Sequence, residues 1–120
     1  MAIANKSNSS TKKTYTTIIS KETKLKGEFN LDARFFIEGY VEGRVICNNV
    51  VVIAKDGVLI GDIHADYVII NGLLKGVVFA NEIEVTKYGV LEAEVITKNL
   101  IVEKGGVFKG TSKIEVENAG

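Results

Sequence analysis

Residues 57–76, GVLIGDIHADYVIINGLLKG, contain the same short pattern twice. In each copy two glycines lie four positions apart, as GVLIG at residues 57–61 and GLLKG at residues 72–76. Between the copies, apolar residues alternate with other residues, which is the period of a β-strand with one buried side. A strand pattern that returns at a short, regular distance is typical of a solenoid protein.

The pattern continues in both directions and gives six units. EGYVEG, YGVLEA and GGVFKG repeat the glycine pair, and ETKLKG has a threonine at the first place. The units whose glycine pairs begin at Gly39 and Gly72 align with the others only if they lack two residues at the corner, which explains the shorter spacings. Glycine adopts positive φ angles without steric cost, so the glycine pair is predicted to form a corner of the coil. Ala93 replaces the second glycine of its pair and is expected to have an ordinary conformation or some strain. The second place is filled, at intervals of 15 to 18 residues, by Gly27, Gly43, Gly61, Gly76, Ala93 and Gly110.

Stacking the units brings apolar residues into columns that alternate with outward positions. Three short strands in each unit, with corners between them, predict a triangular coil. A polar column marks one of those corners, at Asp32, Asn48, Asp66, Asn81 and Lys98. The sequence therefore predicts an all-β, single-domain parallel β-helix (a solenoid) of about six rungs, roughly 25–30 Å long at ~4.8 Å per rung.

Composition limits the class of protein. The 120 residues suffice for one domain, and the zero net charge gives no reason to expect a nucleic-acid partner. One cysteine excludes an internal disulfide framework, and no apolar run is long enough to span a bilayer, so we expect a soluble protein. Residues 1–15, rich in Asn, Ser, Thr and Lys, are predicted to be a disordered tail. The β-helix domain is expected at residues 16–116 and a short tail at 117–120.

Both ends of such a coil expose strand edges and a slice of core. No capping element is recognisable in the sequence, so we expect one molecule to stack on the next and form filaments. The candidate interface of the first rung consists of Ile19, Leu25, Phe29 and Leu31. The candidate interface of the last rung consists of Leu100, Val102, Phe108 and Ile114.

Some outward positions are apolar as well. Five of the six outward residues of one strand are apolar, with Glu84 as the exception, and they are Ile18, Phe36, Val52, Ile69 and Ile101. Another strand adds Ile46, Phe79 and Ile96. A patch of this size is unusual on a monomer. Either a tail covers it or these residues simply favour strands, or it is a candidate lateral or partner face toward another filament, an enzyme or a membrane.

Chemical sites are not indicated. The GLLKG segment lacks the following Ser or Thr and the helix that a phosphate loop requires. His64 is the single histidine and is predicted to be a lone outward residue, and spacing fixes no carboxylate that would orient it as a catalytic base. Cys47 occupies an inward column, as a small buried residue does. Asx residues suit turns for local reasons, so the polar corner is not predicted to bind calcium. We expect no catalytic, cofactor or metal site.

The units also carry a family resemblance. In order, five segments, TTIISKETKLKGEFN, IEGYVEGRV, VVIAKDGVLIGDI, VIINGLLKGVV and LIVEKGGVFKG, resemble the bactofilins, bacterial polymer-forming cytoskeletal proteins. The resemblance covers roughly residues 16–116. It implies a right-handed β-helix and nucleotide-independent, non-polar filaments formed by contact between ends. It also implies a scaffold that helps to determine cell shape by organising peptidoglycan-modifying enzymes.

The same resemblance implies the partners and the location. The partners would be further copies of the chain, and peptidoglycan-modifying enzymes or their membrane regulators. The location would be the cytoplasm at the inner face of the cytoplasmic membrane, with a weak membrane association. The alternative function is a β-helical enzyme of the acyltransferase type or a passive protein-binding module; filament formation by the purified protein would distinguish these from a cytoskeletal scaffold.

Overall fold

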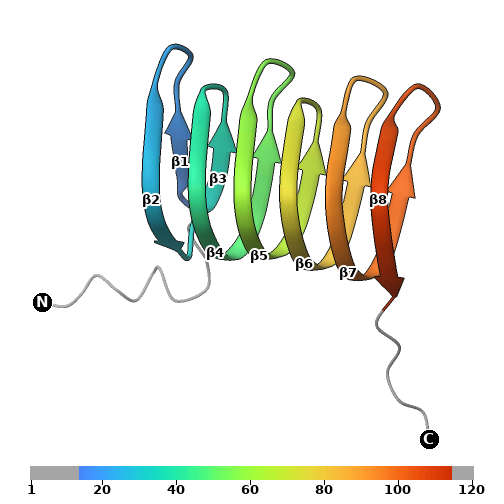
Figure 1. Cartoon of the computed structure of the whole chain (residues 1–120). Coiled ribbons are helices and arrows are strands. Elements are labelled where there is room, and N and C mark those ends of the chain that lie inside the picture. The colour runs from blue at the N-terminus through green and yellow to red at the C-terminus, as the bar shows by residue number, and fades with distance from the viewer. Residues whose placement is uncertain (1–13, 115–120) are drawn as a thin grey trace, which may run out of the picture.

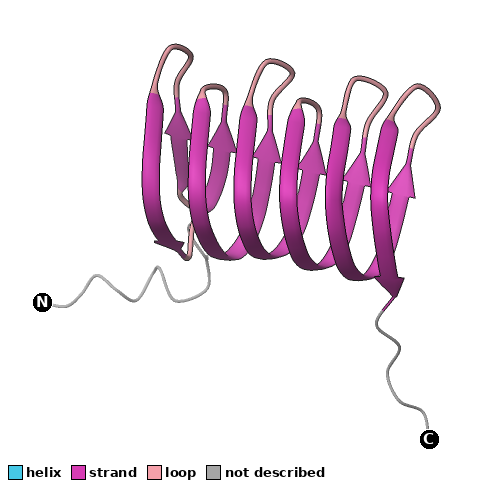
Figure 2. Ribbon diagram, in the orientation of Figure 1, coloured by secondary structure: helices cyan, strands magenta, loops and turns pink. Residues whose placement is uncertain are grey.

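Strands coil one after another along a single axis in the computed structural model, which describes residues 14–114 (Figures 1 and 2). The predicted tails at residues 1–15 and 117–120 lie outside the described residues except for Thr14 and Tyr15. The strands are β1 (Thr16–Ile19), β2 (Lys24–Leu31), β3 (Arg34–Ile37), β4 (Tyr40–Ile53), β5 (Val58–Ile70), β6 (Leu73–Val85), β7 (Val90–Val102) and β8 (Val107–Ile114).

All strand pairs between residues 14 and 114 are parallel and join each coil to the next. The order is β1-β3-β4-β5-β6-β7-β8, with β2 paired to β4. In Figure 1 the strands nearest the viewer run downward, those behind run upward, and the chain advances from left to right, so the coil is right-handed. Six rungs result, and the predicted parallel β-helix is confirmed.

The strand register reproduces the predicted columns. Leu25, Val41, Leu59, Leu74, Leu91 and Phe108 are successive partners across six rungs. The four middle members of this column have no exposed surface. Alternation places these side chains inside, and stacking on the rungs above and below then removes them from water. The core is therefore a set of parallel apolar ladders that runs the length of the coil.

The two glycines of each unit serve different purposes. At the second place the backbone has a positive φ, for example +142° at Gly61, and a Cβ atom there would lie 1.8 Å from the Gly43 carbonyl oxygen. At the first place, Gly57 has no positive φ, but a Cβ atom would lie 2.3 Å from the Ile37 carbonyl oxygen. The positive-φ explanation therefore holds for the second column only, and close approach explains the first. Ala93 has no positive φ, so the expected ordinary conformation is confirmed.

Loop lengths account for the uneven repeat. The loops at residues 38–39 and 71–72 have two residues, and those at 20–23, 54–57, 86–89 and 103–106 have four, as the dropped corner residues predicted. Between Cys47 and Val50 the strand register also shifts by one residue. Because a short loop separates two long ones, the Lys55 ammonium reaches over the Tyr88 ring, at 4.6 Å from its centroid.

Two side-chain hydrogen bonds join neighbouring rungs at the polar corner. The amide of Asn48 donates to Asp32 at 2.9 Å, and the amide of Asn81 donates to Asp66 at 2.5 Å. Each bond joins one rung to the next, so these residues satisfy one another at the turn. No group of three or more metal-binding side chains forms within residues 14–114. In the same part of the chain no helix could cross a membrane.

Candidate functional site: the two ends and an apolar face

Both ends of the coil have strand edges that no other strand covers within the described residues. At the first rung, β1 pairs only with β3 and β2 pairs only with β4. At the last rung, β8 pairs only with β7, and residues 99–102 of β7 pair only with β6. Each end therefore offers backbone N–H and C=O groups along two strand segments. Such an edge is a template for another chain.

Large core residues become exposed at these ends. In the column of Leu59, the middle residues are fully buried, whereas Leu25 is 37% exposed. On the last rung Val102 is 40% exposed, although its neighbour Val85 is buried. Of the part-buried residues that pack against the core, those on the terminal rungs are Phe29, Leu31, Leu100 and Phe108, and the two small ones on middle rungs are Ala65 and Ala80. Each end thus presents a cross-section of the apolar core.

Two of the eight candidate interface residues differ from this description. Ile19 is only 8% exposed, so its own chain already buries it and little of its surface remains for another copy. Ile114 continues β8 and pairs in register with Thr97, but its side chain lies outside the described residues. The two candidate sets occupy opposite ends of the coil and do not meet within one molecule.

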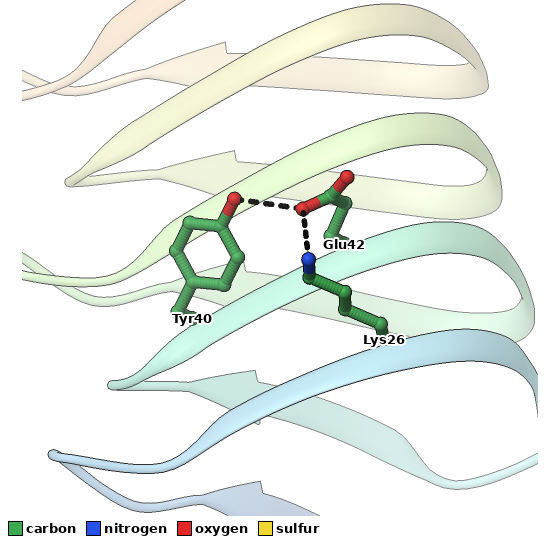
Figure 3. Close-up of polar contacts among 3 residues, drawn as sticks. All are labelled: Lys26, Tyr40 and Glu42. Carbon is green, nitrogen blue, oxygen red and sulfur yellow. Dashed lines mark hydrogen bonds and ion pairs between the residues drawn. The ribbon is translucent and has the colours of Figure 1, made fainter.

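Polar contacts fasten the first rung to the second. Figure 3 shows the Tyr40 hydroxyl donating to Oε1 of Glu42 at 2.9 Å, with the Lys26 ammonium 3.8 Å from the same oxygen. The hydrogen bond to Glu42 is the main reason why the pKa of Tyr40 is raised, because it stabilises the neutral phenol. Inside the coil, the Phe29 and Phe35 rings pack with centroids 6.0 Å apart. Contacts on the outer and the inner side of the coil therefore link the first rung to the second, and the exposed ion pair contributes little of their strength.

The predicted apolar column on the outer surface forms one continuous row. Ile18, Phe36, Val52, Ile69, Glu84 and Ile101 are successive partners in the strand register. Ile18 is 56% exposed and Ile101 48%, and the residues between them are half-buried. Glu84 interrupts the row and accepts a hydrogen bond from the Tyr67 hydroxyl at 2.9 Å. That bond raises the pKa of Tyr67.

The other apolar positions lie across the polar corner from this row. Ile46, His64, Phe79 and Ile96 are successive partners and line a surface hollow of about 530 Å³. The rings of His64 and Phe79 stack with centroids 4.5 Å apart and planes 9° apart. His64 was predicted to be a lone outward residue, and the hollow was not predicted at all. Aligning the outward residues of successive units would have predicted the stacking, because His64 and Phe79 occupy the same position in neighbouring rungs.

The inward column next to this hollow consists of small side chains. The Cys47 thiol donates to the Ala33 carbonyl at 3.3 Å, and the Thr97 hydroxyl donates to the Asn81 carbonyl at 3.1 Å. Thr97 is fully buried, yet these bonds satisfy its hydroxyl. Burial raises the pKa of the Cys47 thiol. The side chain therefore has the properties of a structural cysteine rather than of a reactive one.

Alkylation of Cys47 is expected to be slow in the folded protein. The thiolate is the reactive form, and burial both raises the thiol pKa and blocks access, so we expect iodoacetamide at pH 8 to react at least about tenfold more slowly than in urea. Because the pKa of Cys47 is raised in the folded state, the thiol loses its proton at a lower pH in the unfolded protein. The free energy of unfolding should therefore fall as pH rises above about 8.5. Mass spectrometry measures the modified fraction; equal rates in buffer and urea would contradict this.

Comparison with known proteins gives one match. The model of a protein family described as "Bactofilin: Polymer-forming cytoskeletal" matches residues 17–113, which is more than half of the chain. No match was found among curated proteins or among solved structures. The matched segment begins in β1 and ends in β8, so it includes both open ends of the coil.

Proposed function

Because the chain belongs to the bactofilin family of polymer-forming cytoskeletal proteins, we propose that it polymerises by stacking its terminal rungs on those of other copies. The observation that supports this most is the pair of open ends. Core columns that are fully buried in the middle end in exposed residues such as Leu25 and Val102, beside strand edges that have no partner among the described residues. A second copy would complete both the hydrogen-bond ladder and the apolar columns.

Burial of terminal core residues would provide the main driving force. Complete burial of a Val, Leu or Phe side chain is worth about 1.5–3 kcal/mol relative to full exposure, and the terminal residues are already partly covered. Several of them at each end would contribute together. Strand pairing adds backbone hydrogen bonds with a modest net contribution each. The contact between two copies is therefore expected to have apolar side chains at its centre. Backbone hydrogen bonds at its rim would set the register between the strands of the two copies.

Polymerisation is proposed to need no nucleotide. Residues 73–76 of the GLLKG segment pair with β5 on one side and β7 on the other, and Gly72 lies in the loop just before them. A Cβ atom at Gly76 would lie 2.0 Å from the Gly61 carbonyl oxygen, so rung packing occupies the space around this glycine. These contacts supply a structural role for the glycines without a phosphate group. Sedimentation of the purified protein in nucleotide-free buffer tests this: the protein should pellet, and pelleting only with added ATP or GTP would overturn the proposal.

In the cell, we infer, the filament is a scaffold at the inner face of the cytoplasmic membrane that organises peptidoglycan-modifying enzymes and thereby helps to determine cell shape. Support comes from family membership and from the outer apolar row that runs from Ile18 to Ile101. Polymerisation would repeat this row along the filament. Many copies of a weak docking site would then act together on a partner with several binding modules.

Charges on the outer apolar row are expected to remove lateral contacts only. Val52 and Ile69 are adjacent in register and point out of the core, so Val52→Lys with Ile69→Lys should leave folding and end-to-end filaments intact and abolish bundling or partner binding. Electron microscopy and co-sedimentation with candidate partners measure the two effects. A matched control, Ile60→Lys with Thr111→Lys, adds the same charge on other outward positions. Unchanged bundling and unchanged partner binding would contradict a functional face.

A further inference from the structure

The hollow beside the polar corner has no role in the proposed filament contact. Its apolar part is formed by Ile46, Phe79 and Ile96, with His64 stacked on Phe79. Asn48, Asp66 and Asn81 line its other side. The lining contains one carboxylate and no Lys or Arg. An apolar floor beside an acidic and amide wall is suited to an extended segment that carries both apolar and basic side chains.

The chain enters the coil at the same corner. The Tyr15 carbonyl accepts a hydrogen bond from the Arg34 N–H at 2.9 Å, and Thr16 pairs with Arg34. Tyr15 therefore lies one rung before the corner of Asp32, and Asp66 lies two rungs beyond Asp32. At ~4.8 Å per rung, Asp66 is roughly 14 Å along the axis from the point of entry. The segment that precedes Tyr15 thus starts beside the polar corner that leads to the hollow.

The sequence of that segment matches the hollow in chemistry and in length. Residues 1–13 contain Lys6, Lys12 and Lys13, no acidic residue, and one large β-branched apolar residue, Ile3. Ile3 lies eleven positions before Thr14, a reach of about 36 Å at ~3.3 Å per extended residue. This is more than the ~14 Å to the rung of Asp66. The lysines nearest the entry point would lie beside Asp32.

We propose that residues 1–13 of the same chain dock along the polar corner and place Ile3 in the hollow, with lysines beside Asp32 and Asp66. The docked segment would cover Ile46, Phe79 and Ile96, which are three residues of the candidate lateral or partner face. The segment and any partner that uses this hollow therefore compete for it. The docking does not require the filament contact, because the hollow lies on the side of the coil and is lined by residues of its middle rungs.

Disulfide trapping in the full-length chain tests this. In a Cys47→Ala background, Ile3→Cys is combined either with His64→Cys in the hollow or with Ile60→Cys as the matched control. Position 60 lies on the same rung, is half-buried like position 64, and is only four residues away, on another face. Both positions are within reach of residue 3. We expect an intramolecular cross-link at position 64 that forms at least about tenfold faster than at position 60.

A third variant tests the chemistry of the hollow. Phe79→Lys, added to the Ile3→Cys and His64→Cys pair, should lower the cross-linking rate to that of the control pair, because it places a charge in the apolar floor. Equal rates at positions 60 and 64, or a rate that Phe79→Lys does not change, would overturn the proposal. A cross-link selective for position 64 that joins two chains would also overturn it, since the occupant would then be another copy.

Discussion

Phe108→Arg is expected to leave the β-helix folded and to abolish filament formation. Phe108 is the last member of a core column, packs against the core and is part-exposed at the open end. In a single chain the long arginine side chain can extend into water from this position. In a filament the guanidinium would be buried without a partner, which costs about 3–5 kcal/mol and weakens association at least a hundredfold. Circular dichroism and pelleting measure folding and assembly.

Thr111→Arg is the matched control for that result. Thr111 lies on the same strand three residues further on, but it points outward and is exposed. The control adds the same charge to the last rung without placing it over the core, so it should pellet like the unaltered protein. Normal filaments from a folded Phe108→Arg variant would show that the last rung does not form the contact as proposed. Loss of filaments in both variants would point to total charge instead.

Gly61→Ala is expected to destabilise the fold strongly, although it adds a single methyl group. The φ angle of +142° is strained for alanine, and the new Cβ atom would lie 1.8 Å from the Gly43 carbonyl oxygen. Backbone strain and overpacking each cost about 1–3 kcal/mol or more, so a loss of about 4 kcal/mol is expected. That is a large part of the stability of a single domain. Urea unfolding, carried out in the Phe108→Arg background to exclude polymer effects, measures the loss.

Gly27→Ala separates the two causes. Gly27 has a φ of +151°, but nothing lies within 4 Å of a Cβ atom there, because it belongs to the open first rung. Only the backbone strain remains, so a loss of about 1–2 kcal/mol is expected. Equal losses at Gly27 and Gly61 would mean that close approach between rungs does not matter at this corner. A negligible loss at both positions would contradict the assignment of the second glycine column.

The sequence was sufficient to predict the fold because every rung repeats the same local rule. Alternation identifies the inward columns, and the glycine spacing fixes the corner, so the register of Gly43, Gly61 and Gly76 follows. The shorter loops were also predictable, since dropped residues appear as a shift in the columns. The open ends were predicted from the lack of a recognisable cap.

The parts that were not predicted depend on distances between rungs. Close approach of Gly57 to the Ile37 carbonyl depends on how tightly neighbouring rungs pack, which alternation does not specify. The stacking of His64 on Phe79 required the outward columns to be compared in register. The contact between Lys55 and Tyr88 arises only because the loop between their rungs is short. A sequence pattern predicts which residues share a face. The shape of the surface, with its hollows and side-chain contacts, depends on the three-dimensional positions of the side chains.

X-ray fibre diffraction from aligned filaments tests end-to-end stacking most directly. If terminal rungs stack on one another, the strands lie across the filament and the ~4.8 Å spacing lies along its axis. Six rungs then give an axial repeat of about 29 Å, or about twice that if neighbouring copies face in opposite directions. A 4.8 Å reflection on the meridian with such a repeat is the expected result. A 4.8 Å reflection on the equator would mean that molecules associate through their sides, and it would contradict the account.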